Sequence, residues 1–228
     1  MFDFCNCNSY IAIIGDIKES KNLEERKKVQ LKLNAILDRI NHEYESFISA
    51  KFMITLGDEF QGLLCSGKKI IDIAEEIQRE MYPVNIRFGI GFGAITRDIN
   101  SEMAIGADGP AYYKAREAIQ QLKKNEQKSK TQSSDIRVEL ADDKHSISVM
   151  LNTILTMMVV IKTSWSERQR EIIFEFDKHK GSQTECAKRL EISQSSVQRS
   201  LTKGNYYAYR QAKETVQNVL EEIGEVHV

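Results

Sequence analysis

The chain has 228 residues, of which 41% are hydrophobic and 29% charged, and its formal net charge is −1. This length allows one large domain or two small ones with a buried core, and the composition excludes a disordered chain. The near-zero net charge excludes a global attraction to nucleic acid, so any such attraction has to come from a local patch.

The four cysteines are isolated or too close together for a disulfide framework, and none has zinc-knuckle spacing. We therefore expect reduced thiols in a reducing compartment. No signal peptide is visible. The most apolar stretch, residues 147–161, is interrupted by polar residues and is shorter than the roughly 20 residues that a membrane span needs. A cytoplasmic protein without a membrane partner is expected.

The first two thirds of the chain alternate between strand and helix patterns. Residues 10–15 (YIAIIG) predict a buried strand, and apolar residues at helical spacing predict a helix over 20–47 with Ser20 as its N-cap. Residues 51–56 and 59–64 predict two strands joined by a Gly57-Asp58 hairpin turn. A helix over 68–81, a strand over 84–95 with glycine at alternate positions, and a helix over 110–124 follow.

This order predicts an α+β fold, a ferredoxin-like (palm/cyclase-type) mixed sheet with flanking helices. The polar residues 125–135 predict a loop, and residues 136–140 predict an edge strand. Residues 145–162 predict a long apolar helix, which suits a connector between domains or a dimer interface. We expect an α/β domain over 1–141, a connector helix over 142–164 and an all-α domain over 165–228.

Two aspartates follow glycines at the predicted strand ends. Asp16 comes directly after the first strand, and Asp58 lies in the hairpin turn. If the two strands are neighbours, both carboxylates emerge at one edge of the sheet and repel each other unless a cation lies between them. Mg²⁺ or Mn²⁺ suits oxygen ligands and could align a nucleoside triphosphate. The alternative is that Asp16 caps a helix and Asp58 only makes the turn.

A glycine-rich segment accompanies this pair. Residues 87–93 (RFGIGFG) place glycines where another backbone or a ligand could approach closely. Gly106 and Gly109 then predict a turn before a helix that starts at Pro110. A helix N-terminus can hold an anion, and Lys114 or Arg116 could reach a phosphate. The alternative is a capped helix with a solvated basic face.

In this order, these residues resemble the class III nucleotidyl cyclases and, more distantly, the palm of GGDEF-type enzymes. The resemblance implies that Asp16 and Asp58 bind the metal and that Arg116 contacts phosphate. The other nucleotide-binding candidates are Ile17, Lys18, Ser20, Gly57, Gly106 and Asp108. Two positions depart from the cyclase pattern, Tyr112 in place of Asn and Ile54 in place of a base-selecting Lys. The resemblance therefore implies nucleotide binding more strongly than cyclase chemistry.

Nearly the whole chain is similar to the SatD family. The segments IIGDIKES, ITLGDEFQGLL, IRFGIGFG and AIGADGPAYYKAREAI carry this similarity, and a C-terminal helix-turn-helix follows them. The resemblance implies a bacterial protein and supplies no reaction.

The C-terminal third predicts a helix-turn-helix. Helices over 166–179, 182–190 and 194–203 are separated by short turns, and Ser193 suits the N-cap of the recognition helix. Glu191 stands where glycine is usual. Basic residues between 178 and 213 outnumber acids to give a local +6. The DNA-binding candidates on the exposed face are Gln194, Ser195, Ser196, Gln198, Arg199 and Lys203.

Two functions are compatible with these features. The first is a DNA-binding regulator in which a nucleotide- and metal-binding module acts on the helix-turn-helix. The second is an active metal-dependent nucleotidyl cyclase or nucleotidyltransferase that acts on nucleoside triphosphates. A third use of the C-terminal helices, a bundle for protein contact, also stays open. The final helix, over 210–223, could make a homodimer.

Overall fold

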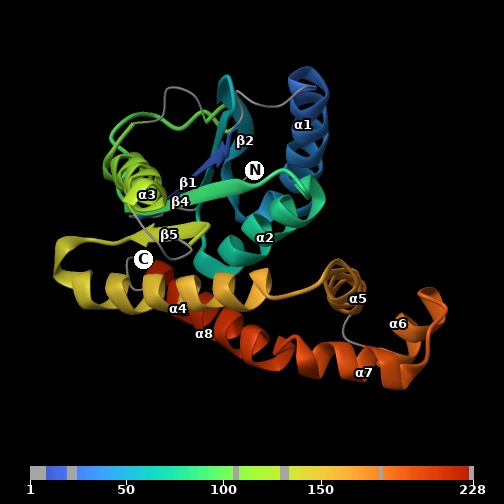
Figure 1. The fold of residues 1–228 in the computed structure, drawn as a ribbon. Coiled ribbons are helices and arrows are strands. Elements are labelled where there is room, and N and C mark those ends of the chain that lie inside the picture. Colours follow the sequence, from blue (N-terminus) through green and yellow to red (C-terminus); the bar gives the residue numbers. More distant parts are fainter. Residues whose placement is uncertain (1–8, 20–24, 105–107, 129–133, 180–181, 226–228) are drawn as a thin grey trace.

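The computed structural model describes residues 9–19, 25–104, 108–128, 134–179 and 182–225 (Figure 1). Five strands form one mixed sheet in the order β2-β3-β1-β4-β5. Neighbouring strands are antiparallel, apart from β4 and β5, which are parallel. The predicted α+β class and the predicted edge strand are confirmed. The strands are β1 (Tyr10–Ile17), β2 (Ile48–Leu56), β3 (Glu59–Leu64), β4 (Ile86–Gly93) and β5 (Ile136–Glu139).

The central strand β1 is buried on both faces. Ile11 and Ile13 belong to the larger hydrophobic cluster, whereas Ala12 and Ile14 belong to a smaller one on the opposite face. This alternation follows from the period of two in a strand. The strand runs two residues beyond its predicted end, because its last residues still pair with β4. Asp16 therefore lies within the strand instead of after it.

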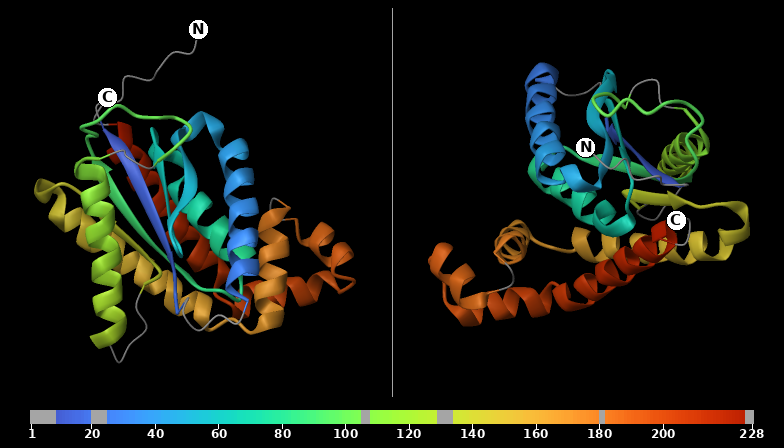
Figure 2. Two further views of the ribbon diagram at one scale, coloured as in Figure 1. Left: turned by 90° about the horizontal axis from the view of Figure 1, so that it is seen from above. Right: turned by 180° about the vertical axis from the view of Figure 1, so that it is seen from behind.

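Helices cover both faces of the sheet (Figure 2). The helices α1 (Arg26–Glu43) and α2 (Ile70–Met81) contribute to the larger cluster on one face, and α3 (Pro110–Lys128) covers the other. Short 3-10 turns lie at η2 (Glu45–Phe47), η3 (Gly67–Lys69) and η4 (Asp142–Lys144). The helix α1 begins later than predicted, and the expected N-cap Ser20 lies outside the described residues.

The backbone of α3 packs directly against the glycines of β4. A Cβ on Gly91 would lie 2.2 Å from the carbonyl oxygen of Ala111, and one on Gly89 would lie 2.2 Å from that of Ala115. Both carbonyls belong to α3. The sequence predicts that either another backbone or a ligand approaches these glycines, and the structure shows the approach of a backbone.

The helix α3 extends into the predicted loop as far as Lys128. Gln121 donates to Asn125 one turn later, and Glu126 pairs with two cations near β1 and β4. These contacts stabilise a polar segment that has no apolar residue to mark it as helical.

The helices α4 (His145–Thr163) and α8 (Tyr206–Glu225) attach the C-terminal third to the sheet domain (Figure 1). Gln217 of α8 accepts a hydrogen bond from the backbone N–H of Ile71 and donates to the carbonyl of Gly67. One hydrophobic cluster runs from the sheet into these helices. The division into domains at 141 and 164 stays a prediction.

One side of α4 is apolar and exposed. Val149, Met150, Met157 and Val160 are each about half exposed, whereas Leu151 and Leu155 are buried against the protein. Among the described helices α4 alone has the length and hydropathy of a membrane span, and 28% of that span is buried. A buried core helix passes the same test, so this is weak support for a membrane span. The cytoplasmic location and the homodimer stay predictions.

The three helices before α8 are α5 (Glu167–Lys178), α6 (Gln183–Arg189) and α7 (Gln194–Lys203). A serine caps each of them, namely Ser166, Ser182 and Ser193. Glu191, in the turn between α6 and α7, has a φ of 52°, in the left-handed region that favours glycine. This conformation explains why glycine is usual at that position. The three predicted helices are present, and the helix-turn-helix domain stays a prediction.

Candidate functional site

The sheet register brings the two predicted metal-binding aspartates to one edge. Asp16 lies opposite Glu59 of β3 and Arg87 of β4. The backbone N–H of Ile17 donates to the carbonyl of Asp58 at 3.2 Å, so the hairpin turn lies directly beside the end of β1. Gly57 makes this turn with a φ of 66°, and its carbonyl accepts from Gln30. The strand that carries Asp16 and the hairpin that carries Asp58 are therefore neighbours, as predicted.

The Asp16 carboxylate is already paired inside the protein. Its Oδ2 atom lies 2.6 Å from Nη1 of Arg87 and 3.1 Å from Nζ of Lys123. The Asp16 residue is only 6% exposed. A buried carboxylate with two cationic partners has its charge neutralised without a metal.

The other charged groups at this edge are more open. Asp58 lies 3.8 Å from Arg26, and Arg116 lies 3.5 Å from Glu59, with half of the Arg116 side chain exposed. Arg116 thus reaches the edge at which Asp16 lies, as the prediction of phosphate contact requires. Pairs at these distances in water contribute at most about 1 kcal/mol to stability, so Arg116 is available to another anion.

A divalent cation does not fit this edge as it is arranged. Within the described residues no group of three or more His, Cys, Asp or Glu side chains could hold a metal ion. A cation between Asp16 and Asp58 would have to displace Arg87 and Lys123 and would then leave them buried or half-buried beside it. The metal-binding role of Asp16 and Asp58 stays a prediction, and no chemical step is derived through a metal.

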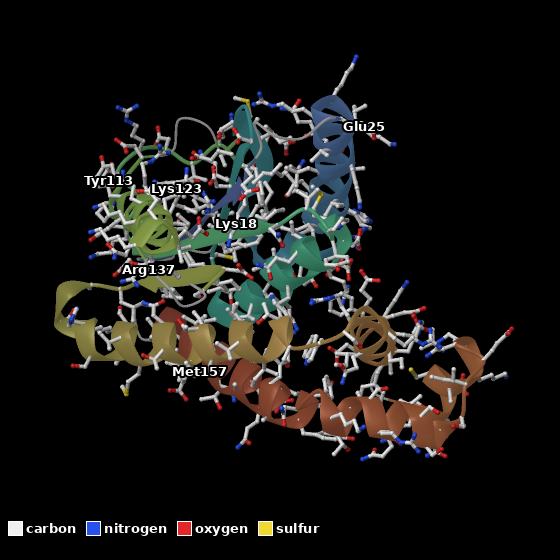
Figure 3. All side chains as sticks on the ribbon, viewed as in Figure 1. Lys18, Glu25, Tyr113, Lys123, Arg137 and Met157 are labelled. Atoms are coloured by element: carbon white, nitrogen blue, oxygen red, sulfur yellow. The ribbon has the colours of Figure 1, made fainter. Side chains whose placement is uncertain are left out.

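Lys18, directly after β1, connects this edge to α3 and to the residue before β5. Lys18 is labelled in Figure 3. Its Nζ lies 2.8 Å from a carboxylate oxygen of Glu126 and from one of Asp135. Burial would lower the pKa of Lys18, but the two carboxylates outweigh burial and raise that pKa above its ordinary value. Glu126 also pairs with Arg87, which pairs with Asp16. Arg87 thus links Asp16 to Glu126, and Lys18 links Glu126 to Asp135. Lys18 is thus held as a structural cation instead of an open phosphate ligand.

Other predicted nucleotide-binding residues lie elsewhere. Asp108 accepts a hydrogen bond from the N–H of Gly109, just before α3 begins at Pro110. Lys123, which pairs with Asp16, lies 13 residues further along the same helix. At 1.5 Å per residue this separation is roughly 20 Å along the helix. Asp108 therefore does not share a small ligand with Asp16 in this arrangement. Ser20 and Gly106 lie outside the described residues.

The two departures from the cyclase pattern are packing positions. Tyr112 is 5% exposed in the smaller hydrophobic cluster, and its hydroxyl has no partner among the described residues. Burial raises the pKa of this hydroxyl. Ile54 of β2 packs against the larger cluster. These side chains contribute to the core, which accounts for their apolar character.

The predicted DNA-binding residues lie together on one side of α7. Val197 and Leu201 are buried toward α5 and α6, whereas the predicted residues face outward and, except for the half-buried Ser196, are exposed. No described residue forms an ion pair with Arg199 or Lys203. The +6 patch is smaller than the sequence count, because Arg189 pairs with Glu175 and Lys213 turns inward to Asp72 and Glu75.

The family model of the SatD family matches residues 10–220. The chain belongs to the SatD family. The match spans both the sheet and the C-terminal helices, so the SatD chain includes the three-helix segment as well as the α/β part. No curated protein matches the chain.

Several solved structures are similar to this SatD chain in part. A monomeric guanylyl cyclase domain from the fungus Blastocladiella emersonii is 18% identical over 63% of this chain and 86% of that one, with a TM-score of 0.42. A bacterial light-regulated adenylyl cyclase is 15% identical over 57% and 74%, with a TM-score of 0.41. A regulator of polyketide synthase expression from Bifidobacterium adolescentis is 14% identical over 97% and 86%, with a TM-score of 0.31. At these values no activity carries over to this chain.

Sequence reasoning missed the partners of Asp16. Arg87 stands in the glycine-rich strand, Lys123 lies at the end of the predicted helix over 110–124, and Glu126 lies in the predicted loop. The signal was a single arginine in an otherwise apolar strand, because a buried arginine needs an acid nearby.

Proposed function

We propose that this SatD-family chain is a DNA-binding regulator that contacts the major groove with α7. The single observation that carries the proposal is the division of α7 into a buried apolar side and an exposed polar side. Val197 and Leu201 fix the helix against α5 and α6, while Gln198, Arg199 and Lys203 point away from the protein. An α-helix fits the major groove, and amide and guanidinium groups match the edges of bases.

The N-terminus of α7 supports the same proposal. Ser193 caps the helix by accepting from the N–H of Ser196, and Gln194 and Ser195 are exposed in its first turn. In helix-turn-helix proteins the first residues of the recognition helix contact base edges. Gln183 of α6 donates to Gln198, so the two helices present one continuous polar surface.

Cations without acid partners suit phosphate contact. Within the part of the chain that the structure describes, Lys188, Arg199 and Lys203 are exposed and form no ion pair. Phosphate contacts position a protein on DNA, whereas base contacts select the sequence. The nearly neutral chain thus has a local cationic surface at α6 and α7.

The junction between α7 and α8 fixes the cationic surface of α6 and α7 relative to the sheet domain. Nε1 of Trp165 donates to the carbonyl of Gly204 at 2.6 Å, between α7 and α8. The long helix α8 then docks on the sheet domain, where Lys213 pairs with Asp72 and Glu75. A change in the sheet domain therefore has a direct path to α7, which is what a regulator requires.

The proposal is tested by selecting duplexes from a random library with the full-length chain and measuring affinity by fluorescence anisotropy. Arg199→Ala should weaken binding to the selected duplex by about 1–3 kcal/mol, roughly 5- to 150-fold, and relax its specificity. Lys124→Ala, an exposed lysine on α3 without an ion pair among the described residues, is the matched control and should have no effect. Absence of DNA binding at low salt contradicts the proposal.

The second candidate function is metal-dependent nucleotide binding or turnover at the edge of Asp16, which requires the metal to displace Arg87 and Lys123 from the Asp16 carboxylate. The observation in its favour is the register that brings Asp16 beside the Asp58 turn. Incubation with nucleoside triphosphates and Mn²⁺ tests it. Metal-dependent nucleotide binding that is lost in Asp16→Ala supports this function, whereas neither binding nor turnover by the native chain rejects it.

A further inference from the structure

We infer that the cleft between the sheet domain and α5 binds a small polyanion with phosphate or carboxylate groups. The cleft has a volume of about 610 Å³. One wall comes from α2 and the residues before β4, and the other comes from the end of α4, from α5 and from α8. Pockets for small molecules typically have volumes of about 300–1,000 Å³. Lys18 and Asp135 also line the cleft, next to the edge that holds Asp16, but Asp16 itself does not line it.

The charges that line the cleft are unequally satisfied. Seven carboxylates line it, and each has a cation or a tyrosine hydroxyl as a partner. Seven basic side chains also line it, but only four of them form ion pairs. Arg79, Arg170 and Lys178 have no carboxylate within ion-pair distance among the described residues. The lining is formally neutral, and of its carboxylates only Asp177 lacks a cation among the described residues, because its partner is the Tyr206 hydroxyl. Three cations without a carboxylate therefore stand against one carboxylate without a cation.

Arg170 is the best-placed of these three cations. Its guanidinium lies 5.0 Å from the centre of the Tyr82 ring and 5.9 Å from that of the Trp165 ring. One Nη atom donates to the carbonyl of Lys162 at 3.1 Å, and the buried Nε has no acceptor among the described residues. Two aromatic rings and one hydrogen bond therefore hold a guanidinium whose charge no carboxylate compensates.

This arrangement selects the chemical class of the ligand. A planar guanidinium donates in parallel to two oxygens of a carboxylate or phosphate, and the resulting charge-assisted bonds are the strong ones. Three cations against the single carboxylate Asp177 favour a ligand with about two negative charges. Arg79 belongs to the sheet domain, while Arg170 and Lys178 belong to α5, so such a ligand would bridge the two walls.

The bridge has a consequence for the orientation of α7. The helix α5 packs against α7, and the ligand would fix α5 relative to α2. A polyanion in the cleft would thereby change the DNA affinity of the chain. This effect rests on the proposed function, whereas the anion site itself does not.

The test uses the full-length chain and two probes, pyrophosphate and citrate, at constant ionic strength. Calorimetry gives the affinity, and the emission of Trp165, the single tryptophan of the chain, reports binding in the cleft. We expect one probe to bind and to change this emission. Tighter binding of pyrophosphate identifies a phosphate ligand, and tighter binding of citrate identifies a carboxylate ligand.

Matched variants locate the site. Arg79→Gln and Lys178→Gln should each weaken the probe by about tenfold through loss of a charge-assisted bond. Arg168→Gln is the control, because Arg168 lies on the same helix, pairs with Glu171 and does not line the cleft. No binding of either probe, or binding that all three variants weaken equally, overturns the inference. Probe binding without an effect on DNA affinity leaves the site standing and removes only its regulatory role.

Discussion

The buried pair of Arg87 and Asp16 allows the sharpest prediction about stability. Arg87→Met keeps an unbranched apolar side chain in place of the arginine stem and removes the charged guanidinium. The two side chains are 10% and 8% exposed, and loss of one partner of a buried pair costs about 3–5 kcal/mol. Lys123 remains 3.1 Å from the same oxygen of Asp16, so we expect the lower end, about 3 kcal/mol.

Urea unfolding measures this loss. With a slope of about 3 kcal/mol per molar urea, the midpoint should fall by roughly 1 M. Arg116→Met is the control, because Arg116 is 55% exposed and its partner Glu59 lies 3.5 Å away, so its loss should cost under about 1 kcal/mol. Asp16→Asn in the Arg87→Met background should recover part of the stability. If Arg87→Met costs no more than Arg116→Met, the charge of Asp16 is not held as described.

Three further predictions concern other parts of the chain. Gly91→Ala should lower the free energy of unfolding by about 1–3 kcal/mol, because the new Cβ would lie 2.2 Å from a backbone oxygen of α3. Thermal unfolding measures this loss, and an unchanged midpoint contradicts the prediction. Glu191→Gly should raise the free energy of unfolding by up to about 1 kcal/mol, because Glu191 has a φ of 52°; a loss of stability in urea would show that the side chain matters more than the backbone. Burial would raise the pKa of Asp72, but Lys213 and Lys69 together outweigh burial and lower that pKa. Asp72 therefore adds stability above its ordinary pKa and loses that stability as the pH falls through the lowered value. Asp72→Asn should therefore destabilise the chain at pH 7 and have less effect near pH 3, as urea midpoints at the two values would show.

The fold was largely predictable from the sequence. Strands such as residues 59–64 have strong β-forming patterns, and α4 is long and apolar, so local chemistry agrees with the tertiary structure. The end of α3 was not predictable from periodicity. Its last turn is polar, and Glu126 is held there by cations that come from distant parts of the sequence.

The sequence predicts where the candidate site lies, but it does not predict that cations already pair with Asp16. The glycine-aspartate pairs predict that Asp16 and Asp58 share an edge, because strand order follows from the order of the elements. The cations that neutralise Asp16 come from β4 and from the end of the predicted helix over 110–124, which periodicity alone does not place beside Asp16. The glycines of β4 indicated a close approach, but only the structure shows that α3 makes it.

The central claim is that α7 contacts DNA, and the salt dependence of DNA affinity tests it most directly. Affinity for the selected duplex should be measured by anisotropy from about 50 to 200 mM salt for the native chain and for Lys203→Ala. The account predicts a steep linear fall of log affinity with log salt, with a slope that Lys203→Ala reduces by about one. A slope that Lys203→Ala leaves unchanged, or no DNA binding at the lowest salt, would contradict it.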